Sequence, residues 1–267
     1  MTTFEDSLTL TPDGDALVAT IDPEWSQGRA AFGGLAAALC LRAIERRVAP
    51  ERTLRSALVQ FVAAVEPGPA RVEVTLHREG KAITQSEARV VQGGVVRAIT
   101  LSAHGAPRGS EVKVEGATPP EHPTPDAMQQ FPYVEGIAPR FTKHFDYRWS
   151  PERFPFIGAE RASLGGWIRH RTPTAGDSAS LAALIDAWPA PVLPMLTGPA
   201  PASSVTWMVN VIATVPRGGF APERWWRFEG EADAADGGYA DVTGKLWSDD
   251  GALVATSRQL VVEFSAR

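Results

Sequence analysis

Cysteine and positive charge are both scarce in this sequence. Its one cysteine, Cys40, cannot form a disulfide within the chain, and the opening residues lack the basic and apolar regions of a secretory signal. We therefore expect a cytoplasmic protein. The 26 Lys and Arg residues are outnumbered by 31 Asp and Glu residues and form no cluster, which gives a net charge of −5. This balance argues against nucleic acid or an anionic membrane as the partner.

Long apolar runs and metal-binding patterns are missing as well. The apolar stretch from Ala30 to Leu41 stops at Arg42, whereas a membrane span needs about 18 apolar residues, so we expect no span. The five histidines are scattered, and no Cys or His pair has the spacing of metal ligands. The sequence also lacks a phosphate-binding loop and a dinucleotide fingerprint. We expect neither a metal nor a cofactor.

The sequence does contain an internal repeat. With 267 residues, 44% of them hydrophobic, the chain is long enough for one large or two small globular domains. Three segments match a later one: Gly80–Ser102 at an offset of 158 with Gly93 over Gly251, Ala57–Val65 over Trp207–Val215 at 150, and Leu35–Leu39 over Leu181–Ile185 at 146. Each half is therefore predicted to have one buried helix followed by about four antiparallel strands.

A proline-rich segment lies between the two copies. It runs from Ala106 to Pro139 and has few periodic apolar residues, which is typical of a connector. We predict an N-terminal unit over residues 1–108, a linker over 109–140 and a C-terminal unit over 141–267.

The repeat also shows where the two halves differ. A position that is apolar in one copy and polar in the other is one where a function can be present in a single half. Under the offset of each segment, three such pairs are Cys40 with Asp186, Leu54 with Ser204, and Leu101 with Gln259. The three polar residues all lie in the second half.

Each of these polar residues has a functional and a plain structural interpretation. Burial would raise the pKa of Asp186 toward the range of a general base, but the residue can equally be a helix-end or solvent-facing aspartate. Ser204 can hydrogen-bond a water molecule or simply stand at a strand edge, and Thr206, expected on the same face of the strand, competes for the hydroxyl role. Gln259 can donate to and accept from one water, or be an exposed strand residue.

Several segments together carry a family resemblance. They are Trp25–Leu39, Arg78–Thr84, Leu184–Pro189, Ser203–Trp207 and Leu246–Gln259. In their order they resemble the acyl-CoA thioesterase II family, over about residues 20 to 265. The resemblance implies an α+β fold, the double hotdog, in which each of two tandem units wraps a curved antiparallel sheet around a helix. It also implies an enzyme that hydrolyses acyl-CoA to free acid and CoA.

The resemblance further implies roles for the three polar residues. Family members are understood to use an Asp, a Thr or Ser, and a Gln to activate water against the thioester carbonyl. Those roles fall on Asp186, Ser204 and Gln259. The family more often has Thr at the middle position, so Thr206 stays a competitor.

The start of the first helix is a candidate for binding the thioester oxygen. In hotdog thioesterases this place usually binds that oxygen, and here it consists of Phe32, Gly33 and Gly34. Their backbone N–H groups and the positive end of the helix dipole suit an oxyanion. The glycines can equally serve close packing of the helix against the sheet.

Two other functions remain open at this point. A hotdog hydratase or dehydratase typically pairs an Asp with a His, and no His adjoins the three residues in the sequence. A non-catalytic acyl-CoA binding protein would keep the fold without the chemistry. Acyl-CoA is the expected partner in each case, and a homo-oligomer is possible because hotdog units pair across their sheets.

Overall fold

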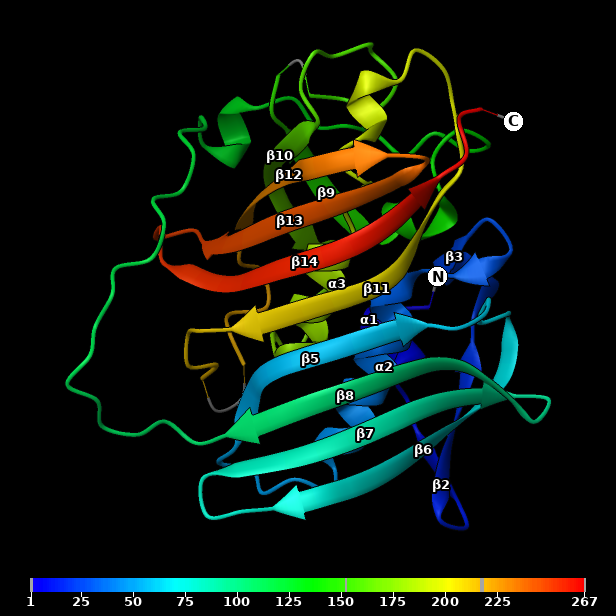
Figure 1. Ribbon diagram of the computed structural model, residues 1–267, viewed down its shortest axis with the longest axis vertical. Helices are drawn as coiled ribbons and strands as arrows, with labels where there is room; N and C mark the ends of the chain where they lie inside the picture. The colour runs from blue at the N-terminus through cyan, green and yellow to red at the C-terminus, as the bar shows by residue number, and fades with distance from the viewer. Residues whose placement is uncertain (1, 152, 217–218, 267) are drawn as a thin grey trace.

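One continuous antiparallel sheet of twelve strands forms the body of the protein (Figure 1). The structure is a computed structural model that describes residues 2–151, 153–216 and 219–266. The strand order is β1-β2-β6-β7-β8-β5-β11-β14-β13-β12-β10-β9, which reads as two six-stranded halves joined through β5 and β11. A separate two-stranded ribbon consists of β3 and β4.

The elements have the following bounds. The first half contains β1 (Thr11–Asp13), β2 (Ala16–Ile21), β3 (Ser26–Gln27), β4 (Ala30–Ala31), β5 (Thr53–Phe61), β6 (Gly68–Glu79), β7 (Ile83–Gln92) and β8 (Val95–Gly105), with helices α1 (Phe4–Ser7) and α2 (Gly33–Glu45). The second half contains β9 (Phe145–Trp149), β10 (Ser163–His170), β11 (Ala202–Val211), β12 (Trp226–Asp236), β13 (Tyr239–Ser248) and β14 (Leu253–Glu263), with helix α3 (Ser178–Asp186). Short 3-10 helices lie at Pro23–Trp25, Pro125–Ala127, Arg140–His144 and Leu193–Met195.

The two halves meet where β5 pairs with β11. Leu58 lies opposite Met208, and the flanking pairs are Ala57 with Val209 and Val59 with Trp207. Exchanging each residue for the one 150 positions away reproduces the same set of pairs. The offset of 150 predicted for these strands is therefore confirmed, and an approximate twofold axis passes between Leu58 and Met208.

The offset of 158 predicted for the last strands is wrong by one residue. Ala57 pairs with Ser102, and its counterpart Trp207 pairs with Gln259. Gln259 therefore corresponds to Ser102 rather than to Leu101. The error arises in the hairpin turns. The first turn has two adjacent glycines with positive φ, Gly93 and Gly94. The observed register aligns Gly251 with Gly94, whereas the predicted alignment used Gly93.

The two long helices pack together against the inner face of the sheet (Figure 1). Ten of the thirteen residues of α2 are buried, which is why this helix is apolar all round rather than amphipathic. Asp177 caps the N-terminus of α3 by accepting from the N–H of Ser180 at 3.0 Å. Arg42, near the C-terminus of α2, reaches the same carboxylate at 2.8 Å, so the helices are antiparallel. Both helices were predicted from the repeat.

The proline-rich segment lies along the outside of the second half. Residues 106–139 contain no strand and only one turn of 3-10 helix. Side chains of the second half donate hydrogen bonds to its backbone: Trp247 to Ala117 at 2.7 Å and Trp167 to Pro123 at 2.9 Å. This segment is irregular but attached at several points. Because all long strands belong to one sheet, the boundaries at 108 and 140 stay a prediction. Among the described residues, no helix is both long and apolar enough to cross a membrane.

Candidate active site

Asp186 is the last residue of α3, where its carboxylate meets the first turn of α2. The negative end of its own helix dipole disfavours a carboxylate at this position. The opposing N-terminus of α2 compensates, because the backbone N–H of Gly34 donates to the carboxylate. Gly33 approaches so closely that a Cβ there would lie 2.8 Å from Oδ2 of Asp186 and 3.0 Å from the Phe61 ring. Asp186 is thus a helix-end residue, but one held between the two halves.

Gln259 completes the contacts of this carboxylate. Its Nε2 donates to Oδ1 of Asp186 at 2.7 Å. Gln259 pairs with Trp207, which is 2% exposed and faces the helices, so its side chain lies on the inner face of the sheet. Within the described residues the amide oxygen of Gln259 accepts no hydrogen bond, which leaves it available to a water molecule. The structure therefore brings together two of the three predicted polar residues.

The surroundings give Asp186 the acidity of a general base. Burial raises the pKa of Asp186 to about 7, while the hydrogen bonds from Gln259 and Gly34 act in the opposite direction. A carboxyl with a pKa near neutrality both accepts and returns a proton readily. Tyr147 lies close by with its own pKa raised by burial and by the charge of Asp186, and its hydroxyl donates to the Ala187 carbonyl at 2.9 Å.

A β-bulge decides which hydroxyl shares the face of Gln259. Ser204 pairs with Val261, which is buried on the inner face two residues beyond Gln259. The register then shifts between Ser204 and Thr206, so Thr206 pairs with Leu260 on the opposite face. The expectation that the two hydroxyls share a face is wrong, because the extra residue in the bulge breaks the alternation of the strand. No hydrogen bond joins Ser204 to Asp186 or Gln259 in the part of the chain that the structure describes.

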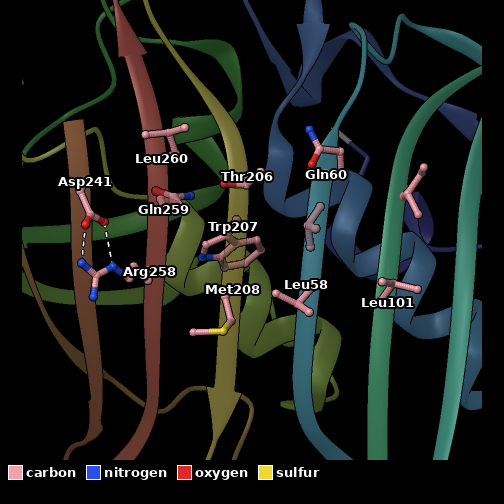
Figure 2. Close-up of a pocket in the computed structure, with 12 residues that line it drawn as sticks. Leu58, Gln60, Leu101, Thr206, Trp207, Met208, Asp241, Arg258, Gln259 and Leu260 are labelled. Carbon is pink, nitrogen blue, oxygen red and sulfur yellow. Dashed lines mark hydrogen bonds and ion pairs between the residues drawn. The ribbon is translucent and has the colours of Figure 1, made fainter. Parts of the chain in front are cut away.

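Thr206 instead lines a hollow on the outer face of the sheet. This hollow, of about 420 Å³, lies over the junction of the two halves (Figure 2). Leu58, Met208 and Leu260 line it with Thr206, and Arg258 and Asp241 form an ion pair at its side (Figure 2). The helices and the carboxylate of Asp186 lie on the other side of the sheet.

The start of α2 serves packing and hydrogen bonding at once. The Phe32 ring is fully buried and stacks on Phe141 at a centroid distance of 4.3 Å. A Cβ on Gly34 would lie 2.3 Å from the Phe32 ring, so both glycines are required by close packing. Of the predicted donors, the N–H of Gly34 points at Asp186 in this structure.

Large aromatic rings surround this site. Trp207 is the neighbour of Gln259 across the strands, and Trp188 follows Asp186 closely and is 7% exposed. The repeat places Trp207 over the small residue Ala57, so the two halves differ here in side-chain size as well as in polarity.

The histidines take no part in the site. Burial lowers the pKa of His104, His144 and His170 to about 4, so these side chains are neutral at pH 7. None of the five donates to or accepts from Asp186, Ser204 or Gln259 in the described ranges. No group of His, Cys, Asp and Glu among the same residues could hold a metal ion.

Comparisons with known proteins agree with this architecture. Residues 21–104 match the model of the acyl-CoA thioesterase N-terminal domain, and residues 116–262 match that of the C-terminal domain. A protein of unknown function with a hot dog fold from Alicyclobacillus acidocaldarius is 27% identical, with a TM-score of 0.88 over 99% of this chain and 98% of that one. An acyl-CoA thioesterase II from Mycobacterium marinum is 20% identical, with a TM-score of 0.74 over 98% of both chains. No curated protein matches the chain.

Two helices wrapped by one symmetric antiparallel sheet are a double hotdog, and the fold is α+β as predicted. The family models cover most of the length of the chain, one for each half. This chain belongs to the acyl-CoA thioesterase family, and its class is that of the thioester hydrolases.

Proposed function

We propose that the protein hydrolyses acyl-CoA to free acid and CoA by direct attack of water. The observation that carries this proposal is the carboxylate of Asp186, with a pKa of about 7, held at 2.7 Å by Gln259 beside the N-terminus of α2. Hydrolysis of acyl-CoA is a reaction of lipid metabolism, and we place it in the cytoplasm.

In the proposed reaction Asp186 acts as the base. A water molecule positioned by Gln259 and Ser204 attacks the thioester carbon while its proton passes to the carboxylate. The tetrahedral intermediate then expels the thiolate of CoA, and the proton on Asp186 passes to that sulfur. The products are the free acid and CoA, and the carboxylate of Asp186 returns to its ionised starting state.

The oxyanion requires donors at the moment when Asp186 gains its proton. A charged carboxylate accepts hydrogen bonds more strongly than a neutral acid does. Protonation of Asp186 therefore weakens its bond to the N–H of Gly34, and we propose that the N–H groups of Gly33 and Gly34 then turn to the oxyanion. The helix dipole of α2 would favour first the carboxylate and then the oxyanion.

The activity is tested with purified protein and acyl-CoA thioesters by following the release of free thiol. We expect release that depends on the enzyme concentration. Calorimetry with a non-hydrolysable acyl-CoA separates the rival functions, since binding without any thiol release would indicate a non-catalytic binding protein. Loss of the double bond of an enoyl-CoA, with no thiol released, would indicate a hydratase.

The β-bulge predicts which hydroxyl matters. Ser204→Ala is expected to lower kcat about tenfold or more, because a water-positioning hydrogen bond is lost from the inner face. Thr206→Val, its matched control on the outer face, is expected to change kcat less than about twofold. Steady-state kinetics of both variants on one acyl-CoA check this. The reverse order of effects would assign the hydroxyl role to Thr206.

The acidity of Asp186 predicts a pH profile. Only the ionised carboxylate is a base, so kcat/KM is expected to rise as the pH increases through about 7. Gln259→Leu removes a hydrogen bond that favours the ionised form, and the rise should move to higher pH. Gln60→Leu, on an exposed position of β5, is the control and should leave the rise in place. A profile that Gln259→Leu does not move would contradict this assignment.

A further inference from the structure

A small cavity lies directly beside the Asp186–Gln259 pair. It is enclosed between the end of α3 and the inner face of β11, β14, β13 and β12, and its volume is about 10 Å³. The residues that matter for its chemistry are Trp188, Trp207, Phe228, Gly244, Ser257 and Gln259. A space of this size holds a single water molecule or one small polar group.

Two residues that line the cavity each have an indole N–H without a partner in the part of the chain that the structure describes. Trp188 is 7% exposed and Trp207 is 2% exposed, and Nε1 of each is buried without a hydrogen bond. Figure 2 shows the nitrogen of Trp207 on the side of β14, the strand that carries Gln259. Buried donors are almost always paired in folded proteins. Two unpaired donors around one cavity therefore point to an acceptor that a ligand supplies.

Aromatic rings close the far end of the cavity. Trp188 stacks on Phe228 at a centroid distance of 5.3 Å and an interplanar angle of 11°. The Phe228 ring lies over two glycines, since a Cβ on Gly230 or Gly244 would come within 3.1 Å or 3.0 Å of it. Gly244, which lies under this ring, pairs with Ser257, so it stands one strand and two residues away from Gln259, or roughly 8 Å at the usual strand dimensions. The space beyond the reaction centre is therefore short.

From the cavity, its two unpaired donors and its aromatic end wall, we propose that the preferred substrate is a thioester of a short acyl group that carries a hydrogen-bond acceptor. This inference rests on the proposed thioesterase function. The oxygen of the acyl group, a carbonyl or a hydroxyl a few carbons from the thioester, accepts from the N–H groups of Trp188 and Trp207. Trp188 and Phe228 then limit the length of the chain.

Three thioesters test this proposal by thiol release: acetoacetyl-CoA, butyryl-CoA and octanoyl-CoA. The first two have the same number of acyl carbons and differ in one oxygen. We expect kcat/KM for acetoacetyl-CoA to exceed that for butyryl-CoA about tenfold or more, because butyryl-CoA leaves the buried donors unpaired. Octanoyl-CoA should be the poorest of the three.

Indole variants separate recognition from structure. Trp188→Phe and Trp207→Phe keep a ring and remove the donor, so each should lower the acetoacetyl-to-butyryl ratio of kcat/KM several-fold, whereas a purely structural loss lowers both values equally. Trp25→Phe is the matched control, because Trp25 has a buried N–H without a partner among the described residues but does not line this cavity. Its ratio should equal that of the unmodified protein. Phe228→Ala, which opens the end wall, should raise the octanoyl-to-butyryl ratio.

The possible outcomes are distinct. Octanoyl-CoA hydrolysed as efficiently as acetoacetyl-CoA would overturn this inference and leave the thioesterase function intact. An acetoacetyl-to-butyryl ratio of kcat/KM near one would overturn the proposed recognition of a hydrogen-bond acceptor, and it too would leave the thioesterase function intact. Absence of thiol release from all three thioesters would instead refute the proposed function, and the substrate class with it.

Discussion

Replacing Asp186 with Asn is expected to lower kcat for thioester hydrolysis by about a hundredfold or more, the usual scale for loss of a general base. The carboxamide has nearly the same shape: its oxygen can accept from the N–H of Gly34, and its NH2 group can donate to the amide oxygen of Gln259. It cannot take a proton from water at neutral pH. The fold should therefore survive while the chemistry is lost, and thiol release from acyl-CoA measures the effect.

An exposed carboxylate provides the control for this experiment. Asp241 lines the outer hollow and forms an ion pair with Arg258, so Asp241→Asn removes the same charge on the opposite face of the sheet. Its kcat is expected to stay within about twofold of the unmodified protein. Unchanged hydrolysis by Asp186→Asn would show that the base is another group.

The same substitution at Asp186 is expected to stabilise the protein at alkaline pH. The pKa of this carboxyl is about 7 in the folded protein, against 3.8 for an ordinary aspartate in water. Below pH 4 both states hold the proton. As the pH rises from about 4 to 7 only the folded state keeps it, so the free energy of unfolding falls with pH. This difference in pKa between the folded and unfolded states lowers the free energy of unfolding by up to about 4 kcal/mol at pH 8.

Asp186→Asn removes this loss, because the carboxamide is neutral at every pH. We expect its unfolding temperature to exceed that of the unmodified protein by several degrees at pH 8, at about 2–4 °C per kcal/mol for a chain of this size. At pH 4 to 5 the difference should be small. Thermal unfolding followed by circular dichroism at both values measures it. An advantage of the same size at pH 4 and pH 8 would mean that burial does not disfavour the charge.

The repeat was enough to predict the architecture. Apolar helices and alternating strands have strong patterns, and finding each of them twice identified α2, α3, the strands β5 and β11, and the hairpins β7–β8 and β13–β14. The predicted equivalence of Leu101 and Gln259 failed by one residue, because a turn with two glycines accepts either alignment. A single residue matters here, since successive residues of a strand face opposite sides of the sheet.

The site was predictable only in part, for a similar reason. The family resemblance selected Asp186 and Gln259 together, whereas the comparison of the halves does not select Gln259 in the observed register, because its counterpart Ser102 is also polar. The opposite orientation of Ser204 and Thr206 was not predictable, because the bulge between them has no residue signature that separates it from a regular strand. Gly34, the partner of Asp186 at the N-terminus of α2, comes from the other half of the chain. Aligning the two halves with each other does not reveal contacts between them.

The pairing of β5 with β11 has a consequence for how this molecule could evolve. The proposed oxyanion donor Gly34 comes from one half and the proposed base Asp186 from the other, so each such centre needs both halves. In a dimer of identical chains every substitution would appear at two symmetric centres at once. In a single chain the two halves can change independently, so the second centre, related by the twofold axis, can be lost without affecting the first. Gln259 donates to the carboxylate of Asp186, whereas its counterpart Ser102 is hydrogen-bonded to Ser86 in the buried core.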